Sequence, residues 1–269
     1  MGVINLLLGG LLLLNKIIVV FTLYCIAVPQ FAFASPSMDK HMTSGVISSP
    51  TIPRIQTTAP ALSPLPDPLP LTPTITTPQP TKFCLTFDDG PSPKYTPQVL
   101  ALLNKYRAHG TFFLVGANFT KYPELLQQIA ISGNEVASHS MTHTDPNDLS
   151  DSELDNEITE SVTFLREASG QPVHYFRPPY GKSNLIYIKR APELGVKIIY
   201  WTVDPRDWSG ITAHLIAERV LTNLEPGCIV LLHDGGGNNR QETVDALETI
   251  LREANALGYN SVTLSNLEM

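Results

Sequence analysis

The chain has 269 residues, 43% of them hydrophobic, and a formal net charge of −7 at neutral pH. Residues 82–269 carry 15 basic and 23 acidic side chains, a net charge of −8, which excludes a surface that attracts nucleic acid. A neutral or surface-bound substrate agrees with this charge.

The N-terminal segment predicts export from the cytoplasm. Residues 3–34 are almost wholly apolar, with one charge at Lys16, and end in the small-residue site Ala32-Phe33-Ala34. This layout predicts a signal peptide over residues 1–34. An N-terminal membrane anchor is the alternative, because the apolar region is long for a signal peptide. Either way the protein is expected to be secreted or extracytoplasmic, in the periplasm or cell wall, and an uncleaved segment would associate it with the membrane.

Residues 35–81 are predicted to form a disordered linker rich in proline and threonine. Between Ser49 and Pro80 there are ten prolines and only two charged residues. Such a segment cannot bury a core and favours an extended spacer with a reach of roughly 3 Å per residue. The folded, catalytic domain is therefore expected over residues 82–269.

Strands and helices alternate along this domain. Short apolar runs predict strands, and apolar residues spaced three or four apart predict helices. Proline at a first helical position and a capping box of Ser150 and Glu153 mark helix starts. The predicted elements are strand 83–85, helix 96–110, strand 111–115, helix 123–133, strand 135–138, a helix from 150, strand 175–176, helix 184–194, strand 196–201, helix 212–224, strand 229–232, a helix through 244–254 and strand 261–264.

This alternation predicts an α/β fold of about seven β/α units with parallel strands. So many consecutive units favour a barrel over an open doubly wound sheet, which is the alternative. Polar residues follow the carboxyl ends of the apolar strands, the edge at which parallel barrels keep their chemistry. They are Asp88, Asp89, His139, Arg177, Asp204 and His233.

The segment Thr86-Phe87-Asp88-Asp89-Gly90 predicts a buried strand that ends in an exposed turn with two carboxylates. Adjacent side chains of a strand point in opposite directions. At the strand end, one acid could bind a metal while its neighbour stays free as a base. A turn that merely caps a loop is the alternative interpretation.

Two histidines, His139 and His143, lie four residues apart, close enough on a helical turn for both to reach one ion. Two imidazoles and one carboxylate, with a position left for water, are typical of a catalytic zinc or a similar divalent metal. Asp89 would supply the carboxylate. A histidine pair on a polar loop without a metal is the alternative.

Three further positions carry candidate chemistry. Arg177 follows the apolar Tyr175-Phe176, which predicts that its guanidinium points into the site and fixes Asp88. Trp208 is either core packing or a wall on which a sugar ring stacks. His233 ends a strand, and a nearby carboxylate would suit it to proton donation near neutral pH.

Cysteine is scarce in the predicted domain. Cys84 and Cys228 each lie within an apolar run. Buried free thiols are predicted, and a disulfide between neighbouring strands is the alternative.

Taken in order, five motifs resemble those of the polysaccharide deacetylases, the NodB-homology proteins of carbohydrate esterase family 4, which include peptidoglycan N-acetylglucosamine and chitooligosaccharide deacetylases. The resemblance covers essentially all of residues 82–269. It implies a distorted β/α barrel and a metal-dependent hydrolysis that removes acetyl groups from N-acetylglucosamine units. The motifs are Thr86-Phe87-Asp88-Asp89-Gly90, His139-x-x-x-His143, Arg177-Pro178-Pro179-Tyr180, Asp204-x-x-Asp207-Trp208 and Leu231-Leu232-His233-Asp234.

The resemblance also implies roles for individual residues. Asp89, His139 and His143 would hold a divalent metal, with zinc favoured and cobalt, nickel or manganese as alternatives. Asp88 would be the general base and His233 the general acid. Arg177 would hold the base, and Asp207, or alternatively Asp204, would pair with His233. The backbone amide of Tyr180 would face the oxyanion, and the substrate-binding residues would be Tyr180, Trp208, Pro179, Leu231 and Asp204.

The implied partner is an N-acetylated polysaccharide, either a cell-wall glycan such as peptidoglycan or a chitin-like polymer, bound by a monomer. An acetylxylan esterase of the same family and a non-catalytic glycan-binding protein are the alternatives. One departure is visible after His143, where the sequence runs Thr144-Asp145 and many relatives have proline. Metal binding is expected to be kept, because the reach to Leu149 is unchanged in length, whereas loop shape and substrate fit are expected to differ.

The linker prediction can be tested by limited proteolysis. Cleavage is expected between Ser49 and Pro80, because extended proline-rich segments are accessible to proteases. It should release a fragment that begins near Lys82 and keeps full activity on soluble substrates. A fragment that unfolds or loses activity would show that the proline-rich stretch packs on the domain.

Overall fold

The computed structural model describes residues 79–237 and 239–267. The predicted signal peptide or anchor over residues 1–34 lies outside this part of the chain, and so does the predicted linker apart from residues 79–81. Within the described part, no helix combines the length and the apolar character needed to cross a membrane.

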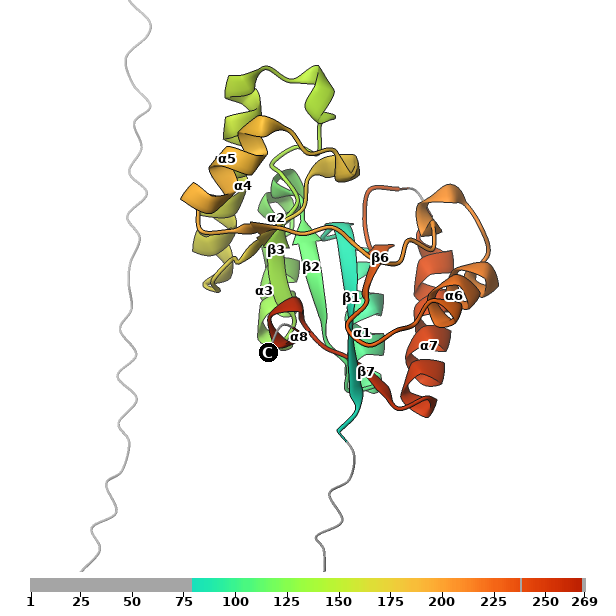
Figure 1. Cartoon of the computed structure of the whole chain (residues 1–269). Coiled ribbons are helices and arrows are strands. Elements are labelled where there is room, and N and C mark those ends of the chain that lie inside the picture. The colour runs from blue at the N-terminus through green and yellow to red at the C-terminus, as the bar shows by residue number, and fades with distance from the viewer. Residues whose placement is uncertain (1–78, 238, 268–269) are drawn as a thin grey trace, which may run out of the picture. The chain divides into compact units, whose positions relative to one another are not determined.

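Seven strands alternate with helices along the described chain, as the sequence predicts (Figure 1). In order the elements are β1 (Thr81–Gly90), α1 (Thr96–Lys105), β2 (Gly110–Leu114), α2 (Gly116–Lys121), α3 (Pro123–Ile131), β3 (Glu135–Ser138), η1 (Pro146–Asp148), α4 (Asp151–Ser169), β4 (Tyr175–Phe176), η2 (Pro179–Gly181), α5 (Leu185–Glu193), β5 (Lys197–Ile198), η3 (Asp207–Ser209), α6 (Ala213–Thr222), β6 (Ile229–His233), α7 (Gln241–Ala256), β7 (Tyr259–Ser261) and α8 (Leu264–Leu267).

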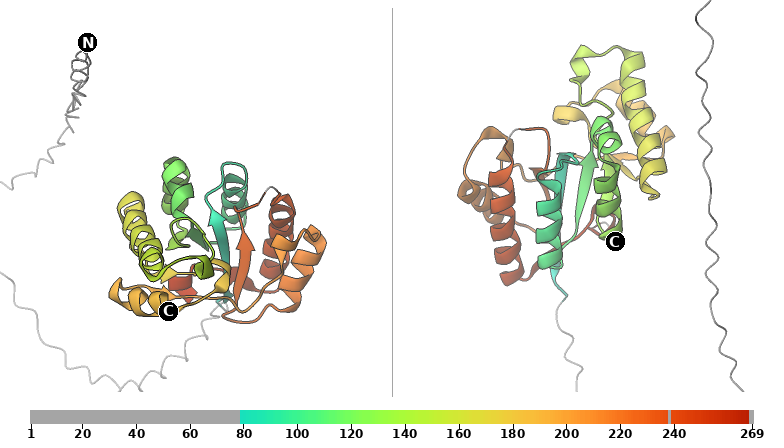
Figure 2. Two further views of the ribbon diagram at one scale, coloured as in Figure 1. Left: turned by 90° about the horizontal axis from the view of Figure 1, so that it is seen from above. Right: turned by 180° about the vertical axis from the view of Figure 1, so that it is seen from behind.

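All strand pairs are parallel, in the order β5-β4-β3-β2-β1-β6, and β7 pairs with the start of β1. The chain after β5 crosses to the other end of the sheet, where the amides of Thr202 and Val203 donate to the carbonyl oxygen of Ile229 at 2.9 and 3.1 Å. Leu231 in turn donates to Val203 at 2.9 Å. This crossing closes the sheet irregularly, with helices around it (Figure 2), so the predicted distorted barrel is confirmed.

The two faces of β1 belong to two different apolar clusters. Phe83, Leu85 and Phe87 pack into the large cluster beneath the helices, whereas Cys84 packs into a small cluster on the other face. Because side chains alternate along a strand, the row that begins with Cys84 continues through Thr86 to Asp88. The barrel interior is therefore apolar at one end and polar at the end that carries the site.

Both cysteines of the domain are free and buried, as predicted. Cys84 lies in the small cluster and Cys228 in the large one, so the two thiols face opposite sides of the sheet. Burial raises the pKa of the Cys84 thiol to about 12, which leaves it unreactive.

The structure corrects several predicted elements. Strand β1 continues to Gly90, so Asp88 and Asp89 are buried within it and do not form an exposed turn. The strand predicted over 196–201 is reduced to β5, because the chain leaves the sheet to cross toward β6. At the C-terminus β7 lies earlier than predicted and α8 replaces the end of the expected strand. A short apolar run does not distinguish these states.

Candidate active site

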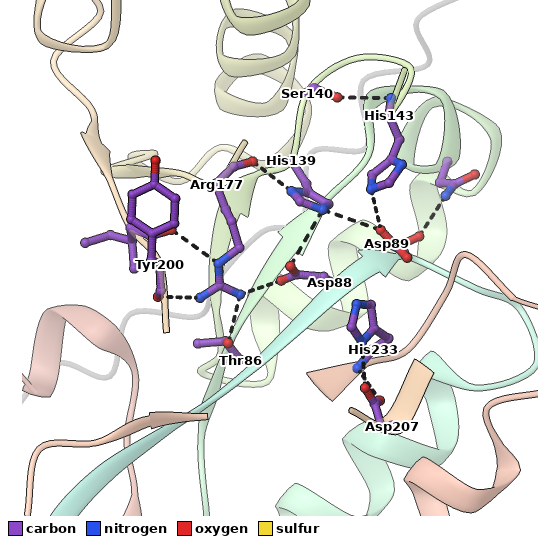
Figure 3. A network of polar contacts seen from close by, with 12 residues as sticks. Thr86, Asp88, Asp89, His139, Ser140, His143, Arg177, Tyr200, Asp207 and His233 are labelled. Atoms are coloured by element: carbon purple, nitrogen blue, oxygen red, sulfur yellow. Dashed lines mark hydrogen bonds and ion pairs between the residues drawn. The ribbon is translucent and has the colours of Figure 1, made fainter. Parts of the chain in front are cut away.

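Two adjacent aspartates of β1 point into the same space, although neighbours on a strand normally face apart. The register of β1 against β2 shifts between Asp88 and Gly90. Asp89 adopts a left-handed backbone with φ of 70°. This bulge rotates the second carboxylate toward the first (Figure 3). Both acids therefore serve one site from consecutive positions.

Arg177 holds Asp88 from within the barrel. Its Nη1 donates to Asp88 Oδ1 at 2.6 Å and to Thr86 Oγ1 at 2.9 Å. The other guanidinium nitrogens donate to the carbonyl oxygens of Ile199 and Tyr200 at 3.3 and 3.0 Å. Arg177 is completely buried, so the predicted contact between guanidinium and carboxylate is present and shielded from water.

Asp89, His139 and His143 form the only group of potential metal ligands within residues 79–237 and 239–267, with donor atoms that lie within 4.8 Å of one another. His143 Nε2 is 3.1 Å and His139 Nε2 is 3.5 Å from Asp89 Oδ1. The four-residue spacing suggested that the two histidines share a helical turn, but residues 139–143 are not helical. The two histidines flank a loop after β3 in which Ser140 and His143 have φ of 67° and 60°.

The geometry of this cluster fits a divalent metal. His139 Nδ1 lies 2.7 Å from the carbonyl oxygen of Arg177, a contact that fixes the ring and leaves Nε2 to face Asp89. Asp89 Oδ1 is buried and has no hydrogen-bond partner among the described residues. A β-carbon on Gly236 would overlap the Asp89 carboxylate, so the glycine lets the loop after β6 approach this side chain.

The charges of the cluster shift the pKa values of its members. Burial acts to raise the pKa of Asp89, but His139, and then His233 and His143, hold it well below its usual range. Burial acts to lower the pKa of His139, but the charge of Asp88 and the contacts with Asp89 raise it. Burial and the neighbouring His139 lower the pKa of His143. Asp89 is therefore charged and His143 neutral at pH 7, as ligands must be.

His233 ends β6, opposite the three potential metal ligands, and contacts Asp207. Asp207 Oδ1 lies 2.8 Å from His233 Nδ1, and Asp207 Oδ2 accepts from the His233 amide and from Thr243 Oγ1, both at 2.9 Å. Burial acts to lower the pKa of His233, but the hydrogen bond and charge of Asp207 outweigh it and raise the pKa to about 9. Asp204, the alternative partner, instead accepts from the Arg206 amide at 2.8 Å.

The predicted residues meet in a cavity of about 600 Å³. Arg177 and Asp207 lie behind the wall, where they contact Asp88 and His233. Pro179 is buried and does not line the cavity, although its neighbour Tyr180 does. The predicted site residues that line it are Asp88, Asp89, His139, His143, Tyr180, Asp204, Trp208, Leu231 and His233.

Two aromatic side chains border the cavity with exposed rings. Tyr180 is 60% and Trp208 48% exposed, so Trp208 is not core packing. The Tyr180 ring stands edge-on to His143 with 4.7 Å between centroids, and its backbone has a φ of 59°. Such exposed rings can stack on an apolar face of a ligand.

Comparison with known proteins agrees with this geometry. Residues 76–199 match the family model "Polysaccharide deacetylase". The chain is 43% identical over 187 residues to a peptidoglycan-N-acetylglucosamine deacetylase of Bacillus cereus, covering 69% of this chain and 87% of the relative. It is 35% identical to a chitooligosaccharide deacetylase of Sinorhizobium fredii, covering 65% and 86%. The chain belongs to the polysaccharide deacetylase family.

A solved structure supports the same assignment. The solved structure of the peptidoglycan deacetylase PdaC of Bacillus subtilis matches this polysaccharide deacetylase with a TM-score of 0.65 and 34% identity, over 72% of this chain and 92% of the solved chain. The predicted family, fold and enzyme class, a hydrolase, are thereby confirmed.

Four residues of the polysaccharide deacetylase site were missed from sequence. Thr243 supports Asp207, and Asn118 Nδ2 donates to the Asp89 carbonyl oxygen at 2.8 Å. Arg240 lines the cavity with its Nη2 4.0 Å from Asp89 Oδ2. Glu157 binds the loop that carries the histidines. Of these, only Glu157 could have been found from the sequence. It is a charged residue three positions after Leu154, on the otherwise apolar face of its helix, where a buried partner is expected.

The affinity of the cluster for metal is expected to fall as the pH is lowered. Although burial opposes it, the charges of Asp88 and Asp89 raise the pKa of His139, so this ring holds a competing proton to a higher pH than usual. Below that pKa, the dissociation constant for Zn²⁺ should rise about tenfold per pH unit. Asp89 adds nothing to this change, because its pKa lies well below the range.

Calorimetric titrations with Zn²⁺ between about pH 5 and 8 would measure this dependence. His214→Ala is the control, because His214 is exposed on α6 and should leave the dependence unchanged. A constant affinity across the range would contradict ligation by His139.

Proposed function

We propose that this enzyme is a metal-dependent deacetylase that hydrolyses the N-acetyl group of N-acetylglucosamine units in a cell-wall glycan, peptidoglycan in the first place, and releases acetate. One observation carries the proposal. A carboxylate held by Arg177 and an imidazole held by Asp207 face one cavity, beside a cluster of ligand atoms that fits a divalent ion.

Asp89, His139 and His143 would hold the ion, with zinc favoured by two imidazoles and one carboxylate. When bound, a divalent ion polarises a carbonyl oxygen and makes water more acidic. The protein supports this ligand set from outside, because the Arg177 carbonyl oxygen orients His139.

Asp88 would be the general base that takes a proton from the attacking water. Its Oδ1 is occupied by Arg177, while its Oδ2 faces the cluster, 3.6 Å from His139 Nε2. The guanidinium thus leaves one carboxylate oxygen for the proton and prevents the side chain from turning away. Geometry of this kind, with a base within reach of the reacting water, is the first requirement of general base catalysis.

His233 would be the general acid for the leaving amine. Amines leave poorly unless protonated, and the raised pKa of about 9 keeps the His233 imidazole charged at neutral pH. Asp207 engages Nδ1, so Nε2 is the nitrogen that can donate toward the cavity. The developing oxyanion would meet the backbone amide of Tyr180, whose left-handed turn lies at the rim of the cavity.

The walls of the cavity suit a neutral sugar. Trp208 and Tyr180 offer exposed aromatic faces, and Leu231 adds an apolar surface. The acidic domain agrees with an uncharged N-acetylglucosamine unit more than with a polyanion. We further propose that the enzyme acts outside the cytoplasm, because the apolar N-terminus predicts export and relatives from Bacillus are named for peptidoglycan. The monomeric state stays a prediction.

Acetate release from three substrates tests this function. The full-length enzyme, stripped of metal and reloaded with Zn²⁺ or Co²⁺, should release acetate from peptidoglycan strands, more slowly from chitin oligomers, and not from acetylated xylan. Asp88→Asn should keep the metal and lose about 10²- to 10⁴-fold in turnover, because an amide cannot take the proton of the water as the carboxylate does. Acetate release from acetylated xylan alone would show that the enzyme hydrolyses an ester and not an amide. No release from any of the three substrates would favour a glycan-binding protein without activity.

The role of the acid can be tested through its pH profile. His233 is protonated below its pKa of about 9, so activity should decline as the pH rises through that value. Asp207→Asn removes the negative charge that raises this pKa, and the alkaline limb should therefore move to lower pH.

Asp204→Asn is the matched control, because Asp204 lines the same cavity but does not contact His233. An alkaline limb that moves equally in both variants, or in neither, would contradict the pairing of Asp207 with the acid.

A further inference from the structure

The loop that carries the two histidines has an unfavourable backbone. Between His139 and His143 the chain makes a tight turn in which Ser140 and His143 are left-handed, at φ of 67° and 60°. Such conformations are unfavourable for a non-glycine residue and persist only where the surroundings hold them. Something outside the loop must therefore stabilise it.

Glu157 of α4 supplies that support. Its Oε2 accepts from the backbone amides of Met141 and Thr142 at 2.9 and 2.8 Å, and its Oε1 accepts from Thr142 Oγ1 at 2.7 Å. The residue is only 8% exposed. Hydrogen bonds from amides to a buried carboxylate are short and strong, because the acceptor is charged. The Glu157 side chain thus fixes the backbone of Met141 and Thr142.

The two histidines depend on this support to different degrees. The His139 ring is fixed from elsewhere, because its Nδ1 contacts the Arg177 carbonyl oxygen. His143 is held through the turn, since its amide donates to Ser140 Oγ at 3.0 Å and the residues between them are those that bind Glu157. Loss of the carboxylate would therefore release His143 first.

We propose that Glu157 is a positioning residue for the metal centre, which holds His143 in reach of the ion bound by Asp89 and His139. The inference rests on the proposed function, because it takes these three residues as ligands. Glu157 does not line the cavity, so it acts through the loop and not on the substrate. Its carboxylate also places a negative charge behind the histidines, which favours a cation in front of them.

Glu157→Gln tests this role with little change in shape. The amide oxygen can still accept from the two backbone amides, and its NH₂ group can donate to the Thr142 hydroxyl, but the negative charge that strengthens these hydrogen bonds is lost. The dissociation constant for Zn²⁺ is expected to rise about 10- to 100-fold, the usual effect of losing a partner that supports a metal ligand. Turnover at saturating Zn²⁺ should return toward the wild-type value.

Glu160→Gln is the matched control, because Glu160 lies on the same helix but is exposed. Its affinity for Zn²⁺ should equal that of the wild type. A second variant, Thr142→Val, removes the contacts of the hydroxyl with Glu157 and with Thr144 and keeps both amide contacts of Glu157. It should weaken Zn²⁺ binding about fivefold, and it carries the test if Glu157→Gln does not fold.

Zn²⁺ titration and the visible spectrum of the Co²⁺ form, which reports ligand geometry, separate the outcomes. If the wild type binds no stoichiometric metal, the proposed function fails and the inference fails with it. If the wild type binds metal and Glu157→Gln or Thr142→Val binds it as tightly, with an unchanged Co²⁺ spectrum, the inference alone is overturned. A lower unfolding temperature without a change in affinity would assign Glu157 a purely structural role.

Discussion

The contact between Arg177 and Asp88 is the interaction on which the rest of the site depends. Arg177 is completely buried, and its guanidinium reaches the carboxylate of β1 as well as two carbonyl oxygens of the chain that crosses from β5 to β6. Its backbone amide donates to Ser138, and its carbonyl oxygen contacts His139. A single residue thus contacts Asp88, the potential metal ligand His139 and the segment that closes the barrel.

The energetics of this contact explain why the site tolerates so much buried charge. A guanidinium placed in the barrel without its partner would be strongly destabilising, with a penalty of roughly 3–5 kcal/mol for breaking a buried pair. The carbonyl oxygens of Ile199 and Tyr200 satisfy the remaining donors. The Asp88 side chain is consequently held in one orientation by a buried partner whose own donors are all satisfied.

The neighbouring acid is used differently because its surroundings differ. The bulge at Asp89 turns this side chain away from Arg177 and toward the imidazoles, and the glycines after His233 leave room for it. Supporting groups from distant helices complete each half of the site. Thr243 at the start of α7 contacts Asp207, and Glu157 in α4 contacts the histidine loop. Asp88, His139 and His233 are therefore each oriented by a buried residue behind them.

The sequence by itself determined the β/α alternation and which side chains gather at the main site. Alternating apolar periods predict β/α units with parallel strands, and parallel strands bring Asp88, His139, Arg177 and His233 to one edge, whatever the details of packing. Order and spacing of five motifs then identify the family. These features are encoded locally, within a strand and the few residues after it, so they can be predicted from the sequence.

Only the tertiary structure decided how these residues are oriented. The bulge at Asp89, the left-handed turn at His143 and the choice of Asp207 over Asp204 follow from contacts between segments far apart in sequence. Glu157 shows the physical reason. A glutamate on an apolar helix stripe is compatible with many partners, and only the packing of α4 behind the loop after β3 selects the amides that it binds.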